Sequence, residues 1–233
     1  MKRLLLSTAI FFGLGATAFA ADAISAMPPA SFNWTGGYIG AQAGYAWGKS
    51  KGGDYARSSG ALDVEGNIDP DGFLGGVYAG YNYQFNNNLV LGGEADLNYA
   101  HLTGEADPLH DTVGPVPPNS ARGEMTWNGS ARIRAGYAFD RFLPYVTGGV
   151  AFGRYKFTPD YINTGPLPGA KTQTGWTVGA GVDYAFTKNL IARVEYRYTD
   201  YGHANYDITG FPDYVSRVDL KTSAIQIGIA YKF

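Results

Sequence analysis

Four arginines and four carboxylates stand at alternate positions within segments that are otherwise apolar. Alternate side chains lie on one face of a β-strand, because successive residues point to opposite faces. A face that carries both signs of charge could line a path that selects ions, or its members could pair with one another and fill an enclosed interior. The eight residues are Glu94, Asp96, Arg132, Arg134, Asp183, Arg193, Glu195 and Arg197.

The three histidines, His101, His110 and His203, fall in or beside segments that we expect to be loops. Imidazole can bind haem iron, although the spacing of these residues does not require such a site. A lipid-modifying enzyme would need a nucleophile beside an oriented base, and the neighbours Thr103 and Asp200 do not supply a serine–histidine pair. We therefore predict no enzyme, no cofactor and no metal site, and keep the histidines as candidate loop ligands.

The segments that carry the charges alternate strictly between apolar and polar residues. In residues 122–139, Met125, Trp127 and Ile133 fall on one face and Arg132 on the other. Such a period of two is typical of β-strands. Eight segments follow the pattern: residues 35–48, 71–85, 89–100, 122–139, 143–157, 174–186, 190–201 and 217–233.

The connections between these segments alternate in length. The short connections are residues 86–88, 140–142 and 187–189, and the long ones are residues 49–70, 101–121, 158–173 and 202–216. Tight periplasmic turns and longer extracellular loops are the layout of outer-membrane barrels. We therefore predict an all-β fold, an eight-stranded antiparallel transmembrane up-and-down β-barrel with both termini on the periplasmic side.

Three features indicate that the apolar face points outward to lipid. Glycines crowd the polar face, where they leave room for charged side chains in a narrow interior: Gly40, Gly44, Gly76, Gly80, Gly92, Gly136, Gly148, Gly179, Gly181 and Gly228. Aromatic residues near the strand ends match the girdles of membrane barrels: Tyr45, Trp47, Phe85, Tyr99, Phe139, Tyr155, Phe157, Tyr184 and Phe186. Tyr231 and Phe233 end an aromatic last strand, which resembles the assembly signal of outer-membrane barrels.

The composition excludes several other classes of protein. Charged residues are 16% of the 233 residues, there are 33 glycines, and cysteine is absent, so no disulfide framework is available. A formal net charge of −2 gives no support for nucleic-acid binding. Residues 1–20 have a basic start, an apolar run and the cleavage pattern Ala18-Phe19-Ala20 of a signal peptide. We expect residues 21–33 to be a short flexible segment and residues 34–233 to form the barrel.

Several motifs, taken in order along the chain, carry a resemblance to a known family. They are Phe32-Asn33-Trp34-Thr35-Gly36-Gly37-Tyr38-Ile39-Gly40, Arg134-Ala135-Gly136-Tyr137-Ala138-Phe139, Leu143-Pro144-Tyr145-Val146-Thr147-Gly148-Gly149-Val150-Ala151, Glu195-Tyr196-Arg197-Tyr198-Thr199-Asp200-Tyr201-Gly202 and Gly228-Ile229-Ala230-Tyr231-Lys232-Phe233. Together they resemble the small outer-membrane β-barrel proteins of alphaproteobacteria, the RopB-type major surface proteins, which are related to OmpA-like and opacity-type barrels of the porin family. The resemblance implies a fold and a location in the Gram-negative outer membrane, and it implies no particular chemistry.

We expect a structural surface protein that supports envelope integrity and displays extracellular loops. The alternatives are a porin-like channel for small solutes and loop-mediated binding of haem or a host surface. An eight-stranded barrel is only just wide enough for its own side chains, so we favour a charge network that plugs the interior. The expected partners are outer-membrane lipid, lipopolysaccharide and the barrel assembly machinery, with an extracellular ligand as a further candidate. The oligomeric state is open.

Overall fold

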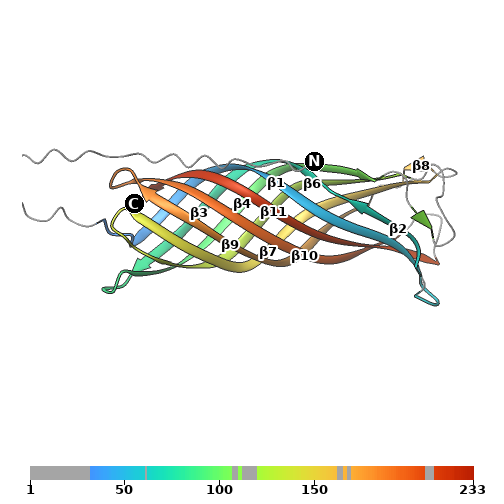
Figure 1. Cartoon of the computed structure of the whole chain (residues 1–233), viewed down its shortest axis with the longest axis horizontal. Coiled ribbons are helices and arrows are strands. Elements are labelled where there is room, and N and C mark those ends of the chain that lie inside the picture. The colour runs from blue at the N-terminus through green and yellow to red at the C-terminus, as the bar shows by residue number, and fades with distance from the viewer. Residues whose placement is uncertain are drawn as a thin grey trace, which may run out of the picture. The chain divides into compact units, whose positions relative to one another are not determined.

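The computed structural model describes residues 32–60, 62–106, 110–111, 120–161, 165–166, 169–207 and 213–233. The predicted signal peptide and most of the predicted flexible segment, residues 21–31, lie outside this set. Eight antiparallel strands follow one another around a ring, and the last strand pairs with the first, so the sheet closes (Figure 1). The predicted eight-stranded up-and-down barrel is confirmed. Among the described residues, no helix is long and apolar enough to span a membrane.

The ring is built from strands that are adjacent in the sequence. Its members are β1 (Gly36–Ala56), β3 (Asp71–Gln84), β4 (Leu89–Ala106), β6 (Ser120–Tyr137), β7 (Phe142–Tyr161), β9 (Gly169–Ala185), β10 (Leu190–Asp207) and β11 (Tyr214–Lys232). Three short strands extend the sheet in the long connections: β2 (Leu62–Ile68) pairs with β1, β5 (His110–Asp111) with β2, and β8 (Gly165–Pro166) with β7.

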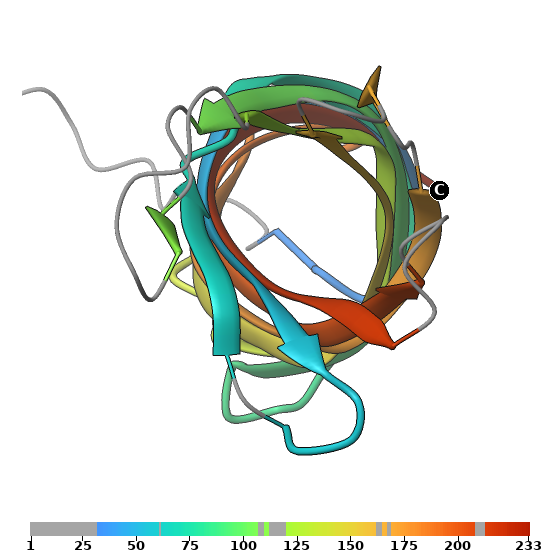
Figure 2. The same ribbon diagram turned by 90° about the vertical axis from the view of Figure 1, so that its right-hand side faces the viewer.

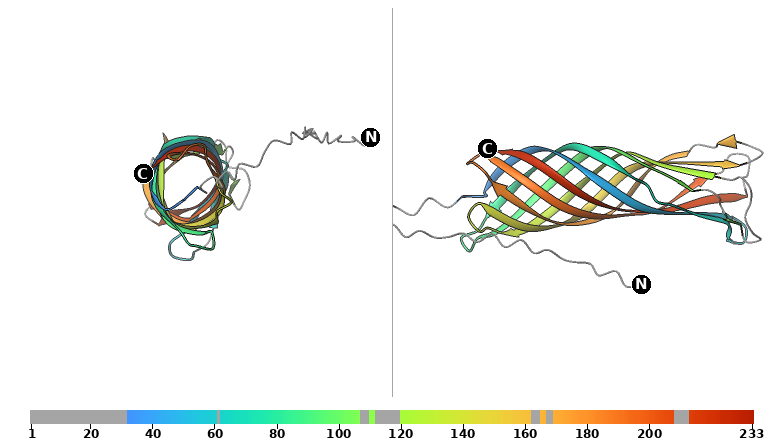
Figure 3. Two further views of the ribbon diagram at one scale, coloured as in Figure 1. Left: turned by 90° about the vertical axis from the view of Figure 1, so that its left-hand side faces the viewer. Right: turned by 45° about the horizontal axis from the view of Figure 1, so that its top comes forward.

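The barrel has short connections at one end and long connections at the other, as the sequence predicts. At one end β3 and β4 are joined by a tight turn, in which the Phe85 amide donates to the Leu89 carbonyl at 2.8 Å and Asn88 adopts a positive φ of 64°. The same turn end holds the C-terminus, whereas β2 and β8 lie at the opposite, loop end (Figure 1; Figure 3, right). By the rule that periplasmic turns are short, the loop end is extracellular.

The strands are longer at the loop end than the sequence predicts. β1 reaches Ala56, where the expected strand stops at residue 48, and β10 reaches Asp207, where it stops at residue 201. Turn-forming residues alone do not end a strand when its neighbour continues to supply hydrogen-bond partners: Gly52 and Gly53 pair with Val218 and Arg217 of β11. His101 and His203 therefore lie in strands instead of in loops.

Apolar side chains cover the outside of the barrel in the membrane zone, as predicted. Phe73 is 74% exposed, whereas Tyr78 on the same strand is buried inside. From Phe73 to Tyr83 the strand rises about 33 Å at the usual rise per residue, of which about 25 Å lies along the barrel axis at a tilt of about 40°. That height matches the lipid-facing band of a membrane barrel.

Three residues of β7 face the opposite side of the barrel wall from the side that the sequence predicts. Tyr155 and Phe157 were expected on the lipid face and are buried inside the barrel, whereas Gly148 was expected inside and lies on the outer face. The period of two cannot decide the faces here, because both alternate sets of β7 are largely apolar. The pairing with β6 decides them, since Gly149 is the residue opposite the inward Arg132.

A fourth residue, Met125, faces inward instead of outward because β6 contains a bulge. Met125 was assigned to the apolar outer face and is buried in the interior. Met125 pairs with Tyr155 and Trp127 pairs with Arg154, so Thr126 is an extra residue without a partner on β7. An extra residue of this kind shifts the alternation by one position. Met125 therefore shares the inner face with Tyr155.

Gly80 and Gly93 test the assignment of inner and outer faces, and we expect opposite results when each is replaced by alanine. A Cβ on Gly80 would lie 2.4 Å from the Tyr38 hydroxyl and 2.6 Å from the Gly93 carbonyl, whereas a Cβ on Gly93 would meet its nearest atom at 4.0 Å. Gly80→Ala should lower the free energy of unfolding by about 1–3 kcal/mol through overpacking. Gly93→Ala should change it by less than about 0.5 kcal/mol. Urea unfolding in detergent measures both, and equal effects would contradict the assignment.

Candidate functional site: the filled interior of the barrel

The eight charged residues expected on one face lie together inside the barrel. They come from β4, β6, β9 and β10, and their inward alternation places them at neighbouring levels: Glu94 pairs in register with Arg132, and Asp183 with Arg193. Side-chain exposure in the resulting ion pairs is between 0 and 8%. We call this set of residues the charge layer: Glu94, Asp96, Arg132, Arg134, Asp183, Arg193, Glu195 and Arg197.

Each carboxylate of the charge layer touches at least two arginines. Glu94 lies 2.5 Å from Arg132 and 2.6 Å from Arg193, measured between carboxylate oxygen and guanidinium nitrogen. Glu195 lies 2.6 Å from Arg132 and 2.9 Å from Arg197. Four positive and four negative groups balance, so the layer needs no mobile counter-ion. This balance matters because an unpaired charge inside a membrane is very costly.

The remaining two acids complete the network. Asp183 lies 2.8 Å from both Arg134 and Arg193. Asp96 lies 3.0 Å from Arg197 and accepts a short hydrogen bond from Ser130. The arginines thus connect β4 with β9 and β10 across the interior.

Tyrosines hold the charge layer on the side of the turn end. The Tyr38 hydroxyl donates to Glu94 at 2.8 Å, and the Tyr145 hydroxyl donates to Glu195 at 2.9 Å. The Arg134 guanidinium lies 3.9 Å from the centre of the Tyr145 ring, and the Arg193 guanidinium 4.3 Å from that of Tyr78. Stacking on aromatic faces stabilises a desolvated guanidinium. These tyrosines were not among the predicted site residues, although their alternation places them on the same face as the charges.

The turn end of the barrel is filled by an aromatic and aliphatic layer. Trp34 is 0% exposed, and its ring lies 4.8 Å from that of Phe32 in an edge-to-face contact. The Trp34 indole donates to the Asp140 carbonyl at 2.9 Å, and the Phe32 amide donates to the Asp140 carboxylate at 2.7 Å. We call this set the turn-end layer: Phe32, Trp34, Tyr38, Tyr78, Val90, Ala138, Leu143, Ala185, Ile191 and Ala230.

The start of the described chain therefore crosses the barrel instead of leading up to it (Figure 2). The predicted flexible segment extends to Asn33, whereas Phe32 is already part of the turn-end layer. Two bulky aromatic residues one position apart before the first strand were the available signal for this packing. Their partners across the barrel are distant in the sequence, so no local pattern shows the contact.

The loop half of the interior is mainly apolar, with the polar side chains of Ser50, Gln173 and Ser216 buried among the apolar ones. Fully buried side chains there include Ile68, Leu102, Tyr155, Val218 and Leu220. They belong to one cluster that also contains Met125, Phe157, Tyr201 and Tyr206. We call this cluster the loop-half layer. The charge layer lies between it and the turn-end layer inside the barrel.

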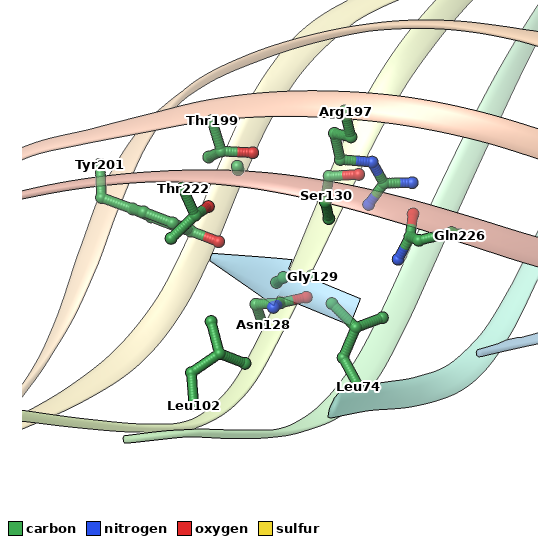
Figure 4. A pocket seen from close by; sticks show the side chains of 13 residues that line it. Leu74, Leu102, Asn128, Gly129, Ser130, Arg197, Thr199, Tyr201, Thr222 and Gln226 are labelled. Carbon is green, nitrogen blue, oxygen red and sulfur yellow. The ribbon is translucent and has the colours of Figure 1, made fainter. Parts of the chain in front are cut away.

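A small cavity of about 20 Å³ lies between the loop-half layer and the charge layer (Figure 4). Its lining includes the apolar side chains of Leu74 and Leu102, the Tyr201 ring, and the polar side chains of Arg197 and Gln226. A volume of this size has room for a water molecule. Among the described residues, side chains of both the loop-half layer and the charge layer border this small space.

Comparison with known proteins identifies the family. Residues 16–233 match the family described as "Outer membrane protein beta-barrel domain". The chain belongs to this family of outer-membrane β-barrel proteins. The 25 kDa outer-membrane immunogenic protein of Brucella abortus is 36% identical over 241 residues, covering 100% of this chain and 99% of that protein. The 22 kDa outer membrane protein of Rhizobium leguminosarum is 36% identical and covers 70% and 67% of the two chains.

Solved structures agree with the outer-membrane β-barrel fold. OprG from Pseudomonas aeruginosa matches with a TM-score of 0.55 at 15% identity, over 87% of this chain and 98% of that one. The outer membrane protease OmpT from Escherichia coli matches with a TM-score of 0.55 at 11% identity, over 88% and 99%. At these identities the likeness shows the fold alone. The relatives and the fold together place this outer-membrane β-barrel protein among the small outer-membrane proteins of alphaproteobacteria.

The last strand of this outer-membrane β-barrel protein carries the predicted assembly signal on its lipid face. Tyr231 and Phe233 are both exposed, and their rings are 5.4 Å apart in an edge-to-face contact. Phe233 donates its backbone amide to the Gly37 carbonyl of β1 at 3.0 Å. Recognition of this strand by the assembly machinery stays a prediction.

His101 and His203, the two histidines whose side chains are described, do not lie together. His101 is exposed on β4 and His203 is exposed on β10, and these strands stand four apart in a ring of eight. The side chain of His110 lies outside the described residues. Within the described part of the chain, no group of three histidine, cysteine or acidic side chains could hold a metal ion.

Proposed function

We propose that this protein is a structural, non-conducting component of the outer membrane that supports envelope integrity and displays its extracellular connections. The observation that carries the proposal is the filled interior: the turn-end layer, the charge layer and the loop-half layer occupy the barrel in succession. An eight-stranded barrel has little interior space beyond its own side chains. A porin-like channel would require the ion pairs of the charge layer to separate.

The structure of the loop end is a second argument for the display of extracellular loops. Four longer connections emerge at the loop end, and β2, β5 and β8 extend the sheet there. The Brucella relatives are named outer-membrane immunogenic proteins. We propose the same surface exposure for this chain, and we propose that it acts without catalysis.

Planar-bilayer recording tests the proposal, and we expect the refolded protein to give no conductance steps under an applied voltage. The physical reason is that ions would have to pass buried, mutually neutralised charges. Insertion is verified separately by flotation with the lipid and by the heat-modifiable gel shift of a folded barrel. Steady steps whose size or ion selectivity changes in Arg132→Gln would contradict the proposal and support the porin-like alternative.

A further inference from the structure

Two basic side chains stand on the lipid-facing side of β7 at its loop half. Arg154 and Lys156 are both exposed, and they alternate with the inward Tyr155 and Phe157. On the same outer face the preceding residue is Phe152, whose ring lies 6.1 Å from that of Trp127. Aromatic residues of this kind mark the boundary between hydrocarbon and headgroups. Arg154 and Lys156 are the next outward-facing residues of β7 beyond that boundary, at the level of the outer-leaflet headgroups.

Within the described part of the chain, the neighbouring strands supply no ion-pair partner for these two charges. Arg154 stands opposite Trp127 on β6 and Thr172 on β9, neither of which is charged. Lys156 stands opposite Glu124 and Ala170. Among the described residues, no carboxylate oxygen, that of Glu124 included, forms a salt bridge with either side chain.

A second basic stretch on the outside of the barrel differs from Arg154 and Lys156 in having acids beside it. At the seam between β1 and β11, Lys51 pairs in register with Asp219, and Lys49 with Lys221. Lys221 forms an ion pair with Asp200 at 3.3 Å. Asp219 and Asp200 therefore lie beside two of the three lysines at the seam, whereas Glu124 is the one acid in register with Arg154 or Lys156.

We propose that Arg154 and Lys156 form a binding site for the phosphorylated headgroup of lipopolysaccharide in the outer leaflet. Guanidinium and ammonium groups are the usual partners of phosphate. The aromatic pair of Trp127 and Phe152 packs against the upper acyl region, and the two basic residues reach the phosphates above it. Phosphate is the feature recognised, and lipid A of the surrounding membrane supplies it at the depth where these side chains stand.

Titration with purified lipopolysaccharide tests the site. The folded protein in dodecyl maltoside micelles is compared with Arg154→Gln/Lys156→Gln, and with Lys49→Gln/Lys51→Gln as a matched control. The control removes the same charge from another face at the loop end. We expect the β7 variant to bind about 30-fold more weakly, from the usual contribution of two basic groups near an anionic lipid surface. The control should stay within about 3-fold of the unaltered protein.

A second titration with dephosphorylated lipopolysaccharide identifies the group that is bound. The unaltered protein should bind this lipid about 30-fold more weakly than phosphorylated lipopolysaccharide. The β7 variant should bind the two lipids with the same affinity. Equal loss in both variants would show general electrostatic attraction and overturn the proposal. Unchanged binding of the β7 variant, or full affinity for the dephosphorylated lipid, would overturn it as well. Competition by millimolar inorganic phosphate would replace lipid A with free phosphate as the ligand and would also overturn the choice of partner.

Discussion

Replacing Arg132 by leucine is expected to lower the free energy of unfolding by about 3–5 kcal/mol. Arg132 contacts Glu94, Asp96 and Glu195, so its loss leaves four buried acids with three arginines. A buried charge without a partner is strongly destabilising because the surroundings cannot solvate it. Unfolding by guanidinium or urea in detergent measures the loss, and the heat-modifiable gel shift reports whether the barrel still forms.

Two variants separate the effect of charge from the effect of any change on β6. Arg122→Leu removes an arginine from the same strand, but its ion pair with Glu105 at 3.3 Å is exposed. Exposed pairs contribute about 0–1 kcal/mol. Adding Glu195→Gln to Arg132→Leu restores the charge balance and should recover part of the lost stability. If Arg132→Leu and Arg122→Leu lose the same amount, the charge layer does not stabilise the barrel as described.

Replacing Trp34 by alanine is expected to lower the free energy of unfolding by about 3–5 kcal/mol, the usual cost of deleting a large buried aromatic side chain. The indole ring is fully buried, packs on Phe32 and donates to the Asp140 carbonyl. Its removal leaves a cavity in the turn-end layer and frees the start of the chain from the β6–β7 turn. The unfolding midpoint in detergent measures the loss.

Trp176→Ala is the matched control for Trp34→Ala. Trp176 is 50% exposed on the outer face and touches the Tyr198 ring. Its truncation should cost about 1 kcal/mol, since only an aromatic contact is lost. A Trp34→Ala protein as stable as the Trp176→Ala protein would show that residues 32–34 do not close the barrel. The free energy of unfolding of Trp34→Phe should lie between those of Trp34→Ala and Trp176→Ala, because phenylalanine keeps most of the packing and loses the hydrogen bond.

Much of the fold follows from local periodicity. The strict alternation around Arg132 and around Arg193 specifies which side chains face inward, and a closed barrel is the β-structure that can place that pattern in lipid. Turn chemistry at residues 86–88 and 140–142 specifies the tight end, where Asn88 and Asp140 adopt positive φ angles of 64° and 52°. These features need only near neighbours in the sequence.

The errors arose where both alternate faces of a segment are apolar or where the alternation breaks. On β7 the faces look alike in the sequence, so the inward position of Tyr155 depends on the register with β6. On β6 the bulge at Thr126 turns Met125 inward. A bulge is created by hydrogen bonding to a second strand, and a single strand carries little sign of it.

The sequence by itself determined the strand number, the closed architecture, the membrane location and the eight residues of one charged face, because each rests on periodicity, turn residues or composition. The tertiary structure decided which arginine meets which carboxylate and that Trp34 fills the turn end. It also decided that Arg154 and Lys156 stand together with no ion-pair partner among the described residues. Those facts depend on contacts between strands far apart in the chain. The physical reason is that ring closure and register set these contacts, and both are properties of the whole sheet.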